Sequence, residues 1–236
     1  MLAPDRGIAV GQVLRSVRLC TAALLLAGAV PGSAASIAGR PEVVDGDGLT
    51  FGPIAIRLHG VDAPEIGQHC ARADGGTWDC GGAAADRLAE LIEGLDVECQ
   101  PLDRDPYGRI VARCFADEHD LSAVLAAEGA AWAFVRYSDD YVPEEAGARA
   151  AHLGVWQAET QAPWDYRANR WERAATASPM TGCPIKGNIS QKGERIYHTP
   201  WSPWYERTKI NEAAGEQWFC DETEAQEAGW RAARSR

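Results

Sequence analysis

Short apolar runs broken by turn residues fill positions 37–61, a pattern that is typical of β-strands. The segment GRPEVVDGDGLTFGPIAIRLHGV predicts three strands, with turns at 45–48 and 52–53, where Gly, Asp and Pro cluster. The segments DVECQPL and GRIVARCFA predict two more strands, on either side of the Tyr-Gly turn at 107–108. Apolar residues at 130–135 predict a further short strand.

Helical spacing of apolar residues occurs in three later segments. The segment 83–92 (AAADRLAELI) ends near Gly94, a usual stop signal, and LSAVLAAEG follows Asp120, which suits an N-cap. A third helix is predicted over 142–152. This order of strands and helices predicts an α+β fold, an OB-type five-stranded Greek-key β-barrel with about three helices packed outside.

The C-terminal third differs in composition from the predicted barrel. Residues 157–181 carry charges, prolines and small residues that indicate a helical tail running into a linker. We therefore predict a barrel domain over 37–167, a linker over 168–181 and a small C-terminal module over 182–234. That module is too small to bury much of a core unaided, so we expect its tryptophans and a disulfide to stabilise it.

The first 35 residues have the features of a signal peptide. Arginines at 6, 15 and 18 precede a short apolar run at 19–30, and small residues at 33–35 suit cleavage after Ala35. The run is too short to span a bilayer. An uncleaved anchor is the alternative, but the pattern favours export to the periplasm or the extracellular space. We expect no transmembrane segment in the mature chain.

The cysteine count supports export. Cys20 lies in the predicted signal peptide, and an even number of six remains. In an exported chain this number is typical of three disulfides, although six cysteines allow 15 pairings. Proximity in the sequence favours Cys70–Cys80, Cys99–Cys114 and Cys183–Cys220. The rival is a structural zinc site, which the chain makes difficult because it has no C-x-x-C pair.

The net charge limits how the chain could hold nucleic acid. It carries 23 basic and 34 acidic residues, a formal net charge of −11. A chain this acidic cannot bind nucleic acid through a diffuse basic face, because such binding depends on releasing counterions from many phosphates. Local binding stays open, where a metal ion and a few arginines outweigh the mean field. Substrate binding is therefore expected to be weak, metal-dependent and indifferent to sequence.

Five charged residues near the predicted turns and strand ends form a candidate active site. Asp47 and Asp62 offer oxygen ligands of the kind that a hard metal ion prefers. Glu65 is the candidate for orienting or deprotonating an attacking water. Arg57 and Arg109 offer planar forks that match phosphate oxygens. These residue types together fit hydrolysis of a phosphodiester.

Each of these strings also has an ordinary structural interpretation. The Asp-Gly-Asp-Gly string at 45–48 is most often only a tight turn, and 62–65 could be a loop that begins a helix. An arginine in a strand, such as Arg57, is usually solvated or paired at the surface. The order and spacing of the strings favour the catalytic interpretation.

The strings VVDGDGL, IRLHGVDAPE and DPYGRIVARC, followed by LSAVLAAEGAAWAFVRY and HLGVW, resemble the staphylococcal (thermonuclease-type) nuclease family. The resemblance covers 38–156, with an extension through PWDYR at 163–167. It implies an OB-fold and a calcium-dependent endonuclease that cleaves DNA and RNA with little sequence preference. Asp47 and Asp62 match the family's calcium carboxylates, and the main-chain carbonyl of Ala63 matches a further calcium ligand. The catalytic residues implied are Arg57, Glu65 and Arg109.

The resemblance also implies contacts with the nucleotide, and it has a visible departure. Tyr107 and Tyr137 match tyrosines that touch the nucleotide in the family, although aromatic residues in a barrel more often serve packing. Gly48 stands where the family usually has Thr after the second acid, so a hydroxyl beside Asp47 is missing.

Two other functions stay open at this point. The chain could be a nucleic-acid-binding protein with weak or no catalysis, because OB barrels often hold nucleic acid without cutting it. It could instead act at the cell envelope through its C-terminal module. We expect that module to be a disulfide-held accessory domain, with a zinc site at Cys183, His198 and Cys220 as the alternative. No stable protein partner is evident, and we expect a monomer.

Overall fold

A computed structural model describes residues 35–233 of the chain. The predicted signal peptide at 1–35, with Cys20, lies outside the described residues except for Ala35. Within residues 35–233, no helix is long and apolar enough to cross a membrane.

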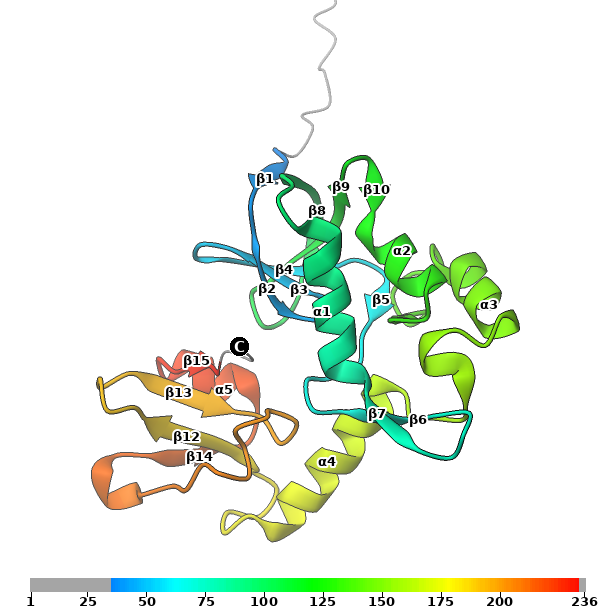
Figure 1. Cartoon of the computed structure of the whole chain (residues 1–236). Helices are drawn as coiled ribbons and strands as arrows, with labels where there is room; N and C mark the ends of the chain where they lie inside the picture. The colour runs from blue at the N-terminus through cyan, green and yellow to red at the C-terminus, as the bar shows by residue number, and fades with distance from the viewer. Residues whose placement is uncertain (1–34, 234–236) are drawn as a thin grey trace, which may run out of the picture. The chain divides into compact units, whose positions relative to one another are not determined.

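A curled, seven-stranded mixed sheet forms the predicted OB-type barrel (Figure 1). Its strands follow the order β1-β8-β9-β4-β3-β2, and β10 pairs with β9. They are β1 (Ile37–Gly39), β2 (Glu42–Asp45), β3 (Gly48–Phe51), β4 (Ile54–Leu58), β8 (Val97–Arg104), β9 (Ile110–Ala116) and β10 (His119–Asp120). The hairpins β2–β3 and β3–β4 are antiparallel, whereas β4 pairs with β9 in parallel. The strands predicted from 37–61, DVECQPL and GRIVARCFA are confirmed.

The barrel core follows from the alternation of apolar residues along the strands. In β9, Ala112, Cys114 and Ala116 are buried and face inward, where Leu49 and Leu58 also lie. Three disulfides join the six cysteines of the described residues. They are Cys70–Cys80, Cys99–Cys114 and Cys183–Cys220, the pairing that proximity favoured. Cys99 and Cys114 are direct partners across β8 and β9, so this disulfide fixes the register of the hairpin.

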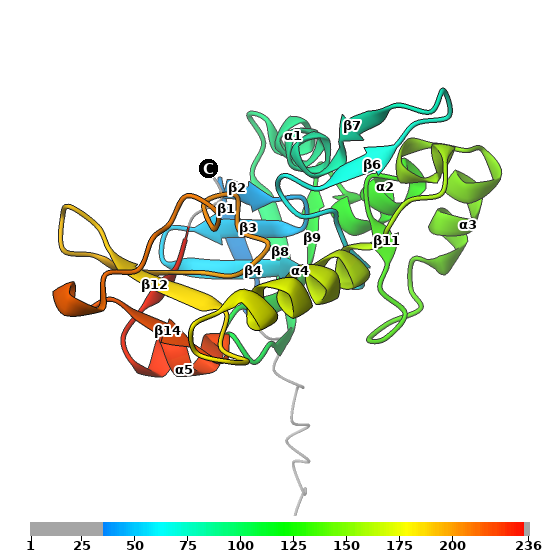
Figure 2. The same ribbon diagram turned by 90° about the horizontal axis from the view of Figure 1, so that it is seen from below.

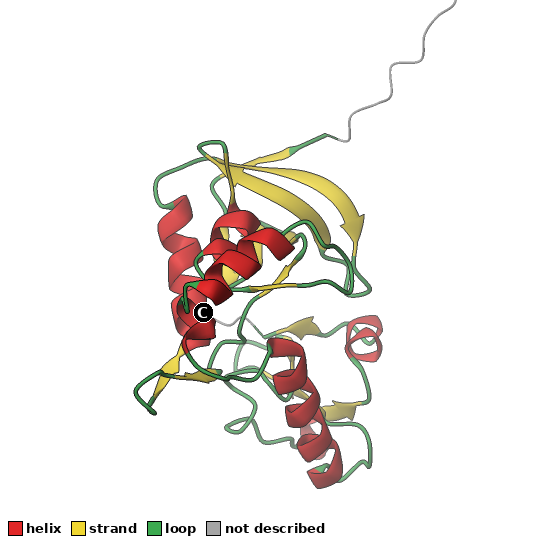
Figure 3. Cartoon of the chain, turned by 90° about the vertical axis from the view of Figure 1, so that its right-hand side faces the viewer, coloured by secondary structure: helices red, strands yellow, loops and turns green. Residues whose placement is uncertain are grey.

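Helices α1 (Cys80–Ile92), α2 (Leu121–Ala127) and α3 (Val142–Ala150) match the three helices predicted for the barrel domain. Figure 3 shows helices packed along one side of the curled strands. Asp79 caps α1 by accepting from Gly82 N, and Asp120 caps α2 as its position predicted. Leu88 of α1 and Leu125 of α2 are fully buried in the core that the sheet encloses.

Two segments differ from their prediction. Residues 66–80, where no strand was predicted, contain the hairpin of β6 (His69–Ala71) and β7 (Thr77–Asp79), in which Gly75 adopts a positive φ of 87° and lets the chain turn. The strand expected at 130–135 is only β11 (Trp132–Ala133), paired with β5 (Val61–Asp62). Phe134 N continues the pairing by one bond to Gly60 O, and the chain then turns, with Tyr137 N donating to Phe134 O at 3.0 Å.

Residues beyond the barrel begin with the short 3-10 helix η1 (Gly154–Gln157) and the helix α4 (Pro163–Ala177). Pro163 stands at the start of α4, where its missing N–H leaves no helical bond unmade. The helix occupies most of the span 168–181 that was expected as a linker. Figure 2 shows α4 beside the small C-terminal sheet.

The C-terminal module is a four-stranded sheet with its own core. Its strands follow the order β14-β12-β13-β15. The elements are β12 (Ile185–Ile189), β13 (Arg195–His198), η2 (Glu212–Ala214), β14 (Gln217–Phe219), α5 (Glu222–Glu227) and β15 (Arg231–Ala232). Its buried cluster comprises Ile185, Tyr197, Phe219, Ala225 and Trp230. Of the tryptophans in this module, Trp230 alone belongs to that cluster, and Trp204 is exposed.

Candidate active site

Four of the five predicted site residues come from consecutive elements of the barrel domain. Asp47 lies in the turn between β2 and β3, and Arg57 lies in β4. Asp62 ends β5, and Glu65 follows three residues later. Leu58 N donates to Asp47 O at 2.8 Å, so the backbone itself brings the acid turn next to Arg57.

The Arg57 guanidinium joins Asp47 and Asp62. Its Nη1 donates to Asp47 Oδ1 at 3.2 Å, and its Nη2 donates to Asp62 Oδ1 at 2.8 Å. The Asp62 side chain is fully buried and the Asp47 side chain is nearly so. Burial works against the charge on Arg57, but the two carboxylates outweigh it and raise the pKa of Arg57. The three side chains therefore form one charged unit shielded from water.

Burial and two neighbouring acids disfavour the charged form of Asp47. Burial raises its pKa to about 6, and the neighbouring acids Asp45 and Asp62 add to the shift, whereas Arg57 and the Ala63 amide oppose it. The Ala63 N–H donates to Asp47 Oδ2 at 2.9 Å. A bound cation stabilises the ionised form of carboxylates that lie this close together, and a divalent metal ion does so more strongly than a single positive side chain.

Glu65 lies beside this pair in a loop that is held from two sides. Gln68 accepts from the Glu65 N–H at 3.1 Å, and its own amide donates to Gln161 O at 2.8 Å. Burial raises the pKa of Glu65 to about 7, against the opposing charge of Arg167. A carboxyl group that titrates near neutral pH is suited to accept a proton from water.

Arg167 belongs to the site and was missed by the sequence analysis. It comes from α4, and it donates to both oxygens of Asp62, at 3.1 and 2.7 Å, and to Glu65 Oε1 at 2.6 Å. Burial disfavours its charge, but Asp62 and Glu65 prevail and raise its pKa. The only signal in the sequence was the string PWDYR, which ends at this arginine and was read solely as an extension of a family resemblance.

Arg109 is not joined to this cluster by the contacts of the described residues. Its Nε donates to Asp105 Oδ2 at 2.7 Å, four residues earlier, and its guanidinium lies 5.8 Å from the Tyr107 ring centre. Tyr107 is half exposed and Tyr137 is exposed. Both rings thus offer faces to solvent, as a surface that stacks on bases requires.

Aromatic rings lie between Tyr137 and the cluster of Asp47, Arg57 and Asp62. The Tyr137 ring lies 5.1 Å from that of Phe134, and Phe134 stacks on Trp164 with ring centres 5.6 Å apart. The Arg57 guanidinium carbon lies 6.0 Å from the centre of the same Phe134 ring. These rings form one wall of the site and exclude water from Arg57.

The oxygen donors of the site suit a hard metal ion that takes few of its ligands from the protein. In the described part of the chain, no group of three or more His, Cys, Asp or Glu side chains is arranged as a metal site. A metal at Asp47 and Asp62 would therefore take two carboxylates, a backbone carbonyl and otherwise water or substrate oxygens. Magnesium sites with one or two carboxylates are common where the substrate carries phosphate, whereas calcium takes about six to eight oxygen ligands, so water and substrate would have to supply the rest.

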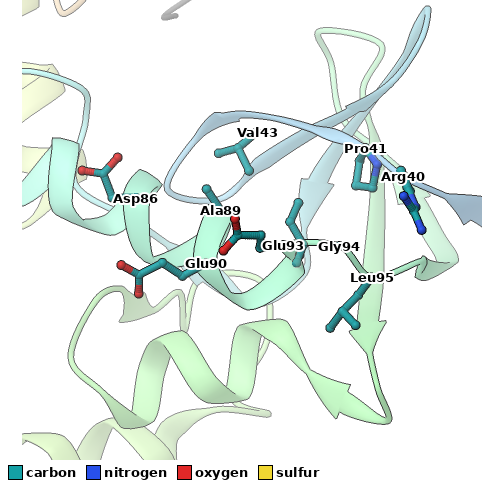
Figure 4. Close-up of a pocket in the computed structure, with 10 residues that line it drawn as sticks. Arg40, Pro41, Val43, Asp86, Ala89, Glu90, Glu93, Gly94 and Leu95 are labelled. Atoms are coloured by element: carbon teal, nitrogen blue, oxygen red, sulfur yellow. The ribbon is translucent and has the colours of Figure 1, made fainter.

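A separate hollow of about 700 Å³ lies between the start of β2 and the C-terminal half of α1 (Figure 4). Its lining includes Arg40, Val43, Glu90, Glu93 and Leu95. None of the predicted site residues faces this hollow. Its size alone therefore gives no reason to place the chemistry there.

Comparisons with known proteins match the part of the chain that carries this candidate site. The family model described as staphylococcal nuclease homologue matches residues 55–158, and the ArfC family model matches residues 168–232. The first range includes Arg57, Asp62, Glu65 and Arg109, whereas Asp47 precedes it. The second covers most of α4 and the C-terminal module.

Individual relatives extend the similarity. The chain is 32% identical over 164 residues to the succinoglycan biosynthesis protein ExoI of Rhizobium meliloti (strain 1021), covering 67% of this chain and 84% of that protein. It is 32% identical over 142 residues to an uncharacterized endonuclease of Escherichia coli, covering 56% and 86%. A probable staphylococcal-like nuclease, CAN4 of Oryza sativa subsp. japonica, is 29% identical over 118 residues, covering 49% and 22%.

Proposed function

The chain belongs to the staphylococcal nuclease family, and from that premise we propose an exported, calcium-dependent nuclease that cleaves DNA and RNA with little sequence preference. Membership of this family makes the protein a phosphodiester hydrolase with an OB-fold. The observation that carries the proposal is the shared guanidinium of Arg57, which holds Asp47 and Asp62 side by side next to Glu65.

The two acids and the Ala63 carbonyl are the residues that would hold calcium. Bound there, the ion would polarise a phosphate oxygen and make a coordinated water more acidic. The buried carboxylates of Asp47 and Asp62 supply hard oxygen donors, which calcium prefers. Family membership and this donor chemistry support calcium as the cofactor.

Glu65 is assigned the role of general base. Its pKa, raised to about 7 by burial, keeps a useful fraction of the carboxylate ionised while leaving it basic enough to take a proton from water. A general base is most effective when its pKa lies close to the working pH, because it is then both substantially ionised and still basic. Glu65 therefore suits the attack of water on phosphorus.

Two arginines are assigned to the substrate phosphate. Arg57 is already desolvated, so a phosphate that reached it would feel a charge little screened by water. Arg109 lies directly before β9, and because Asp105 takes only the Nε of its guanidinium, the Nη1 and Nη2 groups are the donors that would contact a phosphate. Tyr107 and Tyr137 are exposed enough to stack on the nucleotide.

Export is supported by the disulfides, because such bonds persist in oxidising compartments. We propose the periplasm or the extracellular space as the location, with cleavage of the signal peptide after Ala35. We also propose a nuclease domain over 37–167 and an accessory module over 182–234. The protein is proposed to act as a monomer.

Cleavage assays on the purified chain test the proposal. Single-stranded DNA and RNA are incubated with calcium, with calcium plus EDTA, and with magnesium instead of calcium. We expect cleavage of both substrates with calcium, loss of cleavage with EDTA, and weak cleavage with magnesium. No EDTA-sensitive cleavage of either nucleic acid contradicts the proposed function.

A pair of matched variants tests the role of the site. Glu65→Gln removes the base but keeps the shape, and cleavage should fall by about 10²–10⁴, the usual contribution of a general base. Glu98→Gln makes the same change at an exposed position of β8 and should leave the rate unchanged. Equal rates for wild type and Glu65→Gln favour a nucleic-acid-binding role over catalysis by this site.

A further inference from the structure

Arg167 occupies the acid cluster at the position where a cation is needed. Its Nη1 and Nη2 donate to Asp62 Oδ1 and Oδ2 at 3.1 and 2.7 Å, and Nη1 also donates to Glu65 Oε1 at 2.6 Å. Arg57 reaches the same Asp62 Oδ1 from the other side at 2.8 Å. The Asp62 carboxylate, fully buried, is thus enclosed by two guanidinium groups.

Hydrogen-bond capacity at Asp62 leaves little room for a further ligand. A carboxylate has about four lone-pair sites, and the two arginines already use three of them on Asp62. A metal ion binds through the same lone pairs. It therefore cannot reach the Asp62 carboxylate fully while Arg167 forks across both oxygens.

Arg167 and Arg57 differ in the backbone that carries them rather than in exposure, since their side chains are 23% and 17% exposed. Arg57 lies in a central strand between β3 and β9, with the Phe134 ring 6.0 Å away, whereas Arg167 projects from the helix α4. The helix that carries Arg167 is anchored on either side of this residue. Trp164 stacks on Phe134, and Arg170 donates to Pro200 O of the C-terminal module at 2.9 Å. An anchored helix allows the guanidinium to leave Asp62 by a change of side-chain rotamer while the backbone stays in place.

We propose that Arg167 is a displaceable internal counter-ion, which neutralises Asp62 and Glu65 in the metal-free protein and is expelled from Asp62 when calcium binds. It is a positioning residue: it acts through the two acids and sets the calcium affinity of the site. This inference rests on the proposed calcium-dependent function and adds a residue to it.

The proposed counter-ion role and a purely structural role of Arg167 predict opposite changes in calcium affinity when Arg167 is removed. If Arg167 competes with calcium, its removal makes calcium bind more tightly, because no guanidinium must be displaced. If Arg167 instead holds Asp62 and Glu65 in a shape that calcium requires, its removal weakens calcium binding. The sign of the change in the dissociation constant therefore separates the two.

Calorimetric titration of calcium into the metal-free full chain measures this sign. The variants are Arg167→Gln and, as a matched control, Arg173→Gln, an exposed arginine of the same helix that loses the same charge. We expect the calcium dissociation constant of Arg167→Gln to fall by at least about fivefold, the lower range of measured coupling between two ligands. Arg173→Gln should change it by less than about twofold, since only screened long-range charge is lost.

Thermal unfolding in EDTA and in saturating calcium gives a second readout. Arg167→Gln leaves Asp62 short of a partner, so its unfolding midpoint should lie several degrees below wild type in EDTA and approach wild type in calcium. A deficit that is the same with and without calcium overturns the proposal. If Arg167→Gln does not fold, Arg167→Lys keeps one charge without the fork, and its calcium dissociation constant should still be lower than that of wild type.

The outcomes distinguish this inference from the function on which it rests. A wild-type chain that binds no calcium and shows no EDTA-sensitive cleavage overturns both. A wild-type chain that binds calcium and cleaves, beside an Arg167→Gln variant with equal or weaker calcium affinity, overturns the counter-ion and leaves the nuclease standing.

Discussion

Arg109 donates two hydrogen bonds to Asp105, from its side-chain Nε at 2.7 Å and from its backbone nitrogen at 2.9 Å. Asp105 also accepts from the Tyr107 N–H, so this one carboxylate organises the whole turn between β8 and β9. Arg109 directly precedes β9, whose Val111 is the register partner of Arg57 in β4. Asp105 thus orients the guanidinium through Nε, and Nη1 and Nη2 are the donors that would contact a phosphate.

Arg109→Ala should separate activity from stability. The Arg109–Asp105 ion pair is partly exposed, so its loss should change the free energy of unfolding by less than about 1 kcal/mol. Nuclease kcat should nevertheless fall by about 10²–10³, as for other groups that stabilise transition-state charge. Arg104→Ala, on the same hairpin, is the control and should keep its kcat. A full rate in Arg109→Ala would show that Arg109 only closes the turn.

Arg57→Ala should be costly to the fold itself. Removing Arg57 leaves Asp47 with no guanidinium and Asp62 with Arg167 alone, both in a buried setting. Breaking a buried ion pair by removing one partner costs about 3–5 kcal/mol, because a charge is left uncompensated. Urea unfolding in EDTA should show this loss.

Arg87→Ala is the comparison for that experiment. Arg87 pairs with Glu128 and Glu90, but these side chains are substantially exposed. The expected loss is at most about 1 kcal/mol. Equal losses in Arg57→Ala and Arg87→Ala would contradict the view that Asp47, Arg57 and Asp62 form a water-shielded unit.

The part of the site that the sequence predicted is the part built from neighbouring elements. Asp47 and Arg57 lie on the consecutive hairpins β2–β3 and β3–β4, and Asp62 follows Arg57 by only five residues, so the three are neighbours in the sequence as well as in space. Arg167 stands 105 positions after Asp62, and no periodicity or turn signal relates a residue of a distant helix to a buried acid. Long-range electrostatic pairing of this kind is decided by tertiary packing and leaves no local pattern.

The misread local segments have a different cause. Asp74-Gly75-Gly76 is a recognisable turn, but its flanks at 69–71 and 77–79 are too short and too polar to show strand alternation. The Cys70–Cys80 disulfide and the Trp78 side chain give this hairpin its packing instead. In the C-terminal module the tryptophans were expected to supply most of the core, yet Ile185, Tyr197 and Phe219 dominate it, because sheet register decides which rings point inward.

The Cys183–Cys220 disulfide should decide whether the C-terminal module is stable. It closes a loop with a sequence separation of 37 residues, and the loop-entropy relation gives about 4 kcal/mol for a loop of this size. The small core of the module offers little to replace that contribution. Replacing both cysteines with serine should therefore abolish slow hydrogen exchange in β12 and β13 while leaving that of β8 and β9 intact. Unchanged protection in β12 and β13 would mean that the small core suffices.

His198 should make the C-terminal module sensitive to acid. The side chain is buried between β-strands, with its Nε2 2.8 Å from Asn188 Oδ1, and its register partner across the sheet is Lys186. Burial, with a smaller effect of Lys186, lowers the pKa of His198 from 6.5 to about 4. Between these values the unfolded chain binds a proton that the folded chain does not. The contribution of His198 to stability is thus complete above pH 6.5 and is lost as the pH falls toward 4.

The size and sign of this effect can be measured by difference. One pKa unit corresponds to about 1.4 kcal/mol, so the stability of wild type should fall by up to about 3 kcal/mol more than that of His198→Gln between pH 7 and pH 4. Urea unfolding followed by hydrogen exchange in β12 and β13 reports the module rather than the barrel. His119→Gln makes the same change at an exposed position of β10, in the barrel, and is the matched control. Parallel pH profiles for wild type and His198→Gln would show that His198 accepts its proton in the folded module without loss, contrary to its buried setting.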